Sequence, residues 1–133
     1  MLLALEDDLY IGTEKQVGTT SMEHANLSVM FVDDGESGYF YAIDTAKESP
    51  IVDSLFVYNV NSVEERQLLR KLEICWAKNG KMALLFINDY PHAVFDFERL
   101  VGYNHSKFPE PDISTMWSHE EVTQDLVKDW LKL

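Results

Sequence analysis

The clearest pattern in the chain is a series of short runs in which apolar residues alternate or cluster, and these runs predict β-strands. Residues 27–34 form the first run, and two glycine-containing turn pairs separate it from a second run at residues 39–43. A third β-rich run covers residues 55–60. The second and third runs carry large side chains on both faces, so each strand is expected to be covered at least partly on both sides.

The second half of the chain predicts a hairpin followed by another strand. Residues 71–76 and 82–87 flank the turn signal Lys78-Asn79-Gly80. The run 82–87 is apolar at every position, which is typical of a central strand buried on both faces. A turn at 88–91 and a strand at 93–98 follow, with the phenylalanines inward and the acids on the wetter face.

Two Ser-x-x-Glu sequences have the spacing of a helix capping box, at residues 62–65 and 118–121. The first predicts a short helix. The second follows a loop containing Gly102, Pro109 and Pro111, and precedes apolar residues at helical spacing: Val122, Leu126, Val127, Trp130 and Leu131. The predicted fold is α+β, a single domain over residues 1–133, in which an antiparallel meander sheet is packed on one face by a C-terminal amphipathic helix. The other sheet face is expected to stay partly open.

Composition supports one well-filled core. The chain has 133 residues, of which 46% are hydrophobic, and this length is typical of one domain. Its one cysteine, Cys75, excludes an internal disulfide and is expected to be a small buried apolar side chain. The first residues lack the basic and apolar regions of a signal peptide, and no apolar stretch is long enough to span a membrane. We therefore expect a cytoplasmic protein.

The formal charge of −12 disfavours nucleic acid and anionic membrane as partners, because both would add like charge to like. A basic protein surface is the natural complement, although acidic surfaces also serve solubility alone.

Most catalytic and metal-binding patterns are missing. The four histidines, His24, His92, His105 and His119, stand far apart, and none has a spacing that would fix two metal ligands together. The sequence contains no Gly-x-Ser-x-Gly elbow and no phosphate-binding loop. We therefore expect neither a metal nor a cofactor.

The segment 89–96 gathers two carboxylates, a phenol and an imidazole, and Asp89, His92 and Asp96 are a candidate acid–base set. His92 and Asp96 are four residues apart on a strand, which places them about 13 Å from each other. This separation favours a structural role for the segment, in a turn and at a sheet edge.

Residues 33–38 have neither the length nor the closing glutamate of a calcium loop, and they predict a tight turn. Such a turn would present an acidic hairpin tip beside tyrosines. The candidate partner-binding residues are the acidic and aromatic side chains at the turns and on the more open face: Asp33, Asp34, Glu36, Tyr39, Tyr41, Asp89, Tyr90, His92, Asp96 and Glu98.

Two stretches, residues 33–42 (DDGESGYFYA) and 87–97 (INDYPHAVFDF), resemble an uncharacterised family of small bacterial proteins. Weaker matches extend the resemblance over residues 27–109, and Ser37 stands where threonine is more usual. In size and acidity the chain also resembles immunity proteins, which are non-catalytic and neutralise contact-dependent or polymorphic toxins. That resemblance implies a protein that binds and inhibits a cognate toxin domain, a basic nuclease in the leading hypothesis.

Two other classes of function remain open. The first is a small-ligand-binding or homo-oligomerising module that uses the open sheet face. The second is a hydrolase that uses Asp89, His92 and Asp96, which requires the turn to fold these groups into a cleft.

Overall fold

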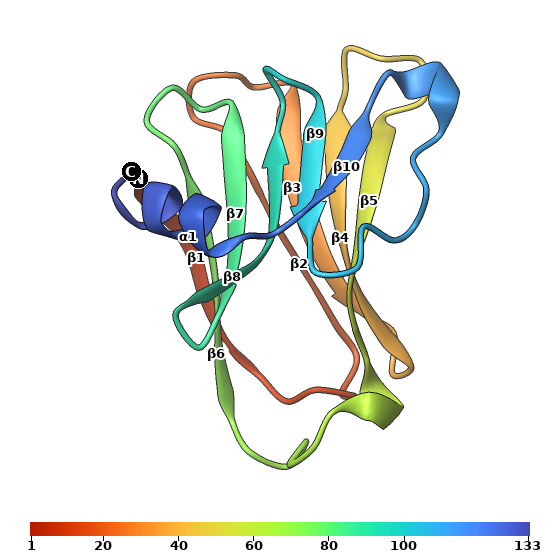
Figure 1. Cartoon of the computed structure of the whole chain (residues 1–133), viewed down its shortest axis with the longest axis vertical. Coiled ribbons are helices and arrows are strands. Elements are labelled where there is room, and N and C mark those ends of the chain that lie inside the picture. The colour runs from red at the N-terminus through yellow and green to blue at the C-terminus, as the bar shows by residue number, and fades with distance from the viewer.

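Ten strands form two sheets that pack face to face in a computed structural model describing residues 1–133 (Figure 1). The larger sheet has the order β1-β6-β7-β8-β9-β10, with strands β1 (Leu2–Leu9), β6 (Arg70–Trp76), β7 (Met82–Ile87), β8 (Tyr90–Asp96), β9 (Val101–Asn104) and β10 (Ser118–Glu121). The smaller sheet has the order β2-β3-β4-β5, with strands β2 (Lys15–Thr20), β3 (Leu27–Asp33), β4 (Ser37–Asp44) and β5 (Ile51–Asn59). Neighbouring strands are antiparallel except β9 and β10, which are parallel.

The main core lies between the two sheets and contains 20 buried residues. Alternate side chains of β3, β4, β6, β7 and β8 point into it, as the period of a strand requires. Phe40 of β4 stacks on Phe95 of β8 with ring centroids 5.1 Å apart, so the contact joins the two sheets directly. The two rings and Leu55 of β5 are fully buried. Burial of a side chain of this size stabilises the fold by about 1.5–3 kcal/mol.

A second, smaller core lies on the outer face of the six-stranded sheet, beneath α1 (Gln124–Leu131). Val127 and Trp130 of the helix pack on this sheet, and the Trp130 ring lies 5.3 Å from that of Tyr103. The prediction of a C-terminal amphipathic helix on one sheet face is therefore confirmed. Neither this helix nor the two short 3-10 turns, Val60–Ser62 and Ile113–Thr115, has the length and apolar character needed to cross a membrane.

Both predicted capping boxes are wrong. Ser118–Glu121 is the strand β10, because its backbone pairs with β9, and the helix is capped instead by Thr123, whose hydroxyl accepts from the Leu126 amide at 3.2 Å. Residues 62–65 do not start a helix: a 3-10 turn ends at Ser62, and an irregular segment leads to β6. A four-residue capping pattern does not form a helix by itself, because starting a helix is costly and the residues that follow must stabilise it.

The single meander sheet is also corrected, because the strands divide between two sheets. The sheet face that was expected to stay open is covered by the other sheet. Gly102, expected in a loop, lies in β9, and the strand predicted at 93–98 runs instead from Tyr90 to Asp96. The strands predicted near 27–34, 39–43, 55–60, 71–76 and 82–87 are confirmed, as is the burial of Cys75.

Candidate functional site

The acidic hairpin between β3 and β4 separates two neighbouring carboxylates. Asp33 is only 1% exposed, and its carboxylate accepts from the Tyr58 hydroxyl at 2.6 Å and from the amides of Gly12 and Gly35 at 2.8 Å. Burial, together with the hydrogen bond to Asp33, raises the pKa of Tyr58. Asp33 therefore ties three segments together inside the protein, which corrects the expectation that it contacts a partner.

Asp34 and Glu36, which we call the acidic tip, are exposed. Asp34 Oδ1 accepts from the amides of Ser37 and Glu36, both at 2.9 Å, and these bonds lower the pKa of its carboxyl group. The Asp34 side chain is thus held in one orientation while its charge faces solvent. Neither residue of the acidic tip takes part in an ion pair.

Four aromatic rings follow the acidic tip on the outer face of the four-stranded sheet, and we call Tyr39, Tyr41, Phe56 and Phe108 the aromatic strip. The tyrosines alternate with fully buried residues of β4, so they point away from the other sheet. Successive ring centroids in the strip lie 5.6–6.1 Å apart. Burial, Tyr39 and the charge of Asp34 raise the pKa of Tyr41, so the strip lies within the field of the acidic tip.

The remaining candidates lie on the other sheet. Asp89, in the β7–β8 turn, pairs with Lys71 at 2.6 Å, with most of its side chain exposed. Tyr90 and His92 form an aromatic cluster with His105, in which His92 Nδ1 and His105 Nε2 are 3.1 Å apart. Burial, followed by the charge of His105, lowers the pKa of His92 to about 4. His92 is therefore neutral at pH 7.

Asp96 and Glu98 lie at the opposite end of β8 from His92. Asp96 is buried, and its Oδ1 atom accepts from the amides of Glu98 and Arg99 at 3.0 Å, so it shapes the β8–β9 turn. This corrects its predicted placement on a wet face, whereas Glu98 is exposed as expected. The proposed acid–base set is not assembled, because the side chains of Asp89, His92 and Asp96 each engage other groups.

Sequence reasoning missed a buried ion pair between β5 and β10. His119 Nε2 lies 2.8 Å from both oxygens of Asp53, and its Nδ1 lies 3.1 Å from the carbonyl of Lys107. Both ring nitrogens face acceptors, so both must donate, which is the protonated form. Burial opposes that form, but Asp53 and the carbonyl outweigh it and the pKa of His119 is raised.

The His119–Asp53 pair is closed to ligands, since the two side chains are 2% and 3% exposed. No local signal could have revealed it, because its members are 66 positions apart. Its place in the fold makes it a clamp between the two sheets. Elsewhere in the chain, no three His, Cys, Asp or Glu side chains are grouped so that they could hold a metal ion.

The fold and these groups define a β-sandwich protein with a solvent-facing aromatic and acidic surface. Over residues 9–131 the chain matches the family described as "Uncharacterized protein conserved in bacteria (DUF2251)", and it belongs to that family. The match extends the resemblance expected over 27–109 to β2 and to the C-terminal helix. An "Uncharacterized protein" of Haemophilus influenzae (strain ATCC 51907 / DSM 11121 / KW20 / Rd) is 57% identical over 130 residues, which cover 97% of this chain and 81% of that protein. No solved structure matches the chain.

Proposed function

We propose that the protein is a non-catalytic binding protein whose partner is a basic protein, and that contact is made through the aromatic strip and the acidic tip. In its specific form, the proposal is an immunity protein that neutralises a cognate toxin domain, a basic nuclease, in bacteria. The observation that carries the proposal is the juxtaposition of mutually packed, half-exposed aromatic rings with carboxylates that have no cationic partner.

The aromatic strip has the composition of a binding hot spot. Tyrosine and other aromatic residues are enriched in protein interfaces because they cover a large area and lose little conformational entropy on binding. Tyr39 lies between Tyr41 and Phe56, and the three rings already constrain one another in the free protein. A partner would therefore meet a surface that needs little further ordering.

The charge distribution supports a basic partner. Ion pairs engage four of the 23 carboxylates, namely Asp7, Asp53, Glu73 and Asp89, so most of the negative charge is uncompensated within the chain. Uncompensated charge of one sign speeds association with an oppositely charged surface and repels unsuitable partners. A nuclease needs a basic groove for its own substrate, and an acidic surface can occupy that groove.

The test begins with crosslinking and affinity capture from the bacterium that carries the gene, followed by purification of the captured protein. Its affinity is then measured by calorimetry for wild type, for Asp34→Lys/Glu36→Lys and for Asp125→Lys/Asp129→Lys. The last variant is a matched control, because it changes the net charge equally on exposed positions of α1. Tyr39→Ala tests the aromatic strip separately.

We expect the acidic-tip variant and Tyr39→Ala each to weaken binding at least tenfold, and the helix variant to weaken it far less. The acidic-tip variant should also reduce the salt dependence of the affinity. For the immunity form, the partner expressed alone should arrest growth and co-expression of this protein should restore it. Equal binding by both charge variants, or capture of the protein by itself alone, would overturn the proposal.

A further inference from the structure

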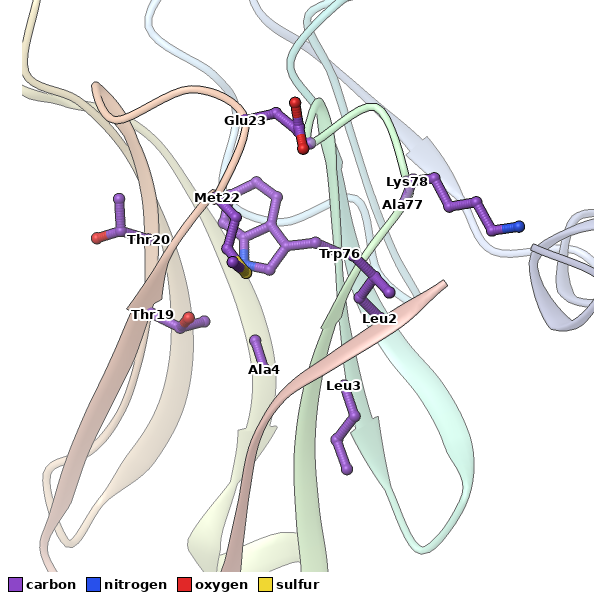
Figure 2. Close-up of a pocket in the computed structure, with 11 residues that line it drawn as sticks. Leu2, Leu3, Ala4, Thr19, Thr20, Met22, Glu23, Trp76, Ala77 and Lys78 are labelled. Atoms are coloured by element: carbon purple, nitrogen blue, oxygen red, sulfur yellow. The ribbon is translucent and has the colours of Figure 1, made fainter.

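A recess of about 260 Å³ opens at one end of the sandwich, between the β2–β3 loop and the β6–β7 turn (Figure 2). Hydrogen bonds hold its upper wall: Ser21 Oγ donates to the carbonyl of Gly80 at 2.8 Å, and His24 Nε2 lies 3.1 Å from the carbonyl of Asn79. The two loops are therefore tied to each other, and the recess is built into the fold.

The indole of Trp76 forms the inner wall of this recess. Trp76 is only 3% exposed, and its ring stacks on Phe97 with centroids 6.0 Å apart. Its Nε1 atom is the one buried side-chain nitrogen or oxygen in the chain that has no hydrogen-bond partner. Buried polar groups are almost always paired, so an unpaired donor beside a recess calls for an acceptor from outside the chain.

The other walls are mainly apolar. Leu2, Ala4, Met22 and Ala77 line the recess, and the Thr19 hydroxyl adds a polar group that makes no side-chain hydrogen bond. Figure 2 shows the Lys78 ammonium directed away from the recess, while the Glu23 carboxylate lies at its rim. No cation is thus directed inward to receive an anionic ligand.

We propose that this recess binds a small, uncharged, mainly apolar molecule that carries one hydrogen-bond acceptor, such as the carbonyl of an aromatic or alicyclic ketone, ester or amide. The acceptor takes the N–H of Trp76, and the apolar body lies against the Leu2, Ala4 and Met22 side chains. At about 260 Å³ the recess lies just below the range typical of sites for drug-sized ligands, so it suits a small molecule. The site is separate from the aromatic strip and does not depend on the proposed partner.

Met22 lies at the rim of the recess. Its side chain is 91% exposed and lines the same recess, so it covers little of the recess in the free protein. Methionine is unbranched and has three rotatable bonds, so it can close over a bound molecule. Because Nε1 is itself shielded from solvent, an acceptor can reach it only when the side chains around the indole shift locally.

The experiment follows the indole N–H signals of the 15N-labelled full chain by NMR. The probes are acetophenone and α-methylstyrene, which have the same shape and differ in that a methylene group replaces the carbonyl oxygen. Trp76→Phe assigns the Trp76 signal, and the indole signals of Trp117 and Trp130 serve as internal controls. Acetophenone should move the Trp76 signal downfield and bind about fivefold more tightly than α-methylstyrene, which is the effect of one net hydrogen bond.

Two variants separate binding from folding. Ala4→Phe, in the edge strand β1, should fill the recess and abolish the shift without a change in melting temperature, whereas Ala25→Phe in an exposed loop should leave binding intact. Trp76→Phe should bind both probes equally. The proposal is overturned if acetophenone does not shift the Trp76 signal, if both probes bind wild type equally, or if the shift persists in Ala4→Phe.

Discussion

The buried His119–Asp53 pair makes the strongest quantitative prediction about what holds the two sheets together. Asp53→Asn keeps the shape of the side chain and removes its charge, while His119 stays enclosed between Lys107 and β5. Removal of one partner of a buried ion pair costs about 3–5 kcal/mol, because the other partner is left uncompensated. For a chain of this length, that loss lowers the melting temperature by on the order of 10–20 °C.

A matched control is available in the same molecule. Lys15 and Asp7 form an ion pair with the same N–O distance of 2.8 Å, but on the surface, where 43% of the Asp7 side chain is exposed. Asp7→Asn should therefore leave the melting temperature nearly unchanged, since water screens an exposed pair and solvates the partner that remains. The two pairs have the same N–O distance, so the comparison measures the effect of burial alone.

The assay is urea unfolding followed by tryptophan fluorescence from pH 6 to pH 9. The folded-state pKa of His119 lies above the ordinary histidine value of about 6.5, so the pair stabilises the protein fully below about pH 6.5. The stabilisation disappears as pH rises through the folded pKa. Asp53→Asn should lose this dependence on pH. This prediction is refuted if Asp53→Asn and Asp7→Asn unfold at the same urea concentration, or if the wild type loses no stability at alkaline pH. Either result would mean that the His119–Asp53 pair does not stabilise the fold.

Two further predictions concern His92 and Asp33. The folded-state pKa of His92, about 4, lies below its unfolded value. The contribution of neutral His92 to stability is therefore present above pH 6.5 and is lost as pH falls toward 4, by up to about 3 kcal/mol. His92→Phe should flatten this loss in acid-unfolding curves. Tyr58→Phe removes one donor from the buried Asp33 carboxylate and should destabilise the fold by about 1–3 kcal/mol in urea titrations. Asp34→Asn should have little effect. A larger loss of stability in Asp34→Asn than in Tyr58→Phe would place the structural carboxylate at Asp34.

Strands with strong local signals were predictable from the sequence. Residues 82–87 are apolar throughout and follow a glycine turn, and the structure places β7 between two neighbours with both faces buried. The edge strands β1 and β2 carry no comparable signal, because β1 has only one buried residue and β2 has none. They are strands because of backbone pairing: β1 pairs with β6, which is distant in sequence, and β2 pairs with β3.

The division into two sheets could not be predicted for a related reason. Alternation of apolar residues shows that a strand has a buried face, but it does not show whether a helix or another sheet covers that face. The contacts that decide this, such as Phe40 on Phe95 and His119 on Asp53, join residues more than 50 positions apart. The sequence therefore predicted the C-terminal helix on its sheet and missed the second sheet on the other side.

The acidic hairpin shows why site residues are harder to predict than strands. Asp33 and Asp34 have the same local sequence signal, yet strand parity turns one inward and leaves the other in solvent. Gly38 faces Asp33 across the hairpin, and a Cβ atom there would lie 2.7 Å from the Tyr58 ring. Glycine is thus required for the Tyr58 hydroxyl to reach Asp33. The motif at residues 33–42 is explained in large part by this internal contact, so its match to the family supports a shared fold, and evidence for a shared partner must come from the exposed residues beside it.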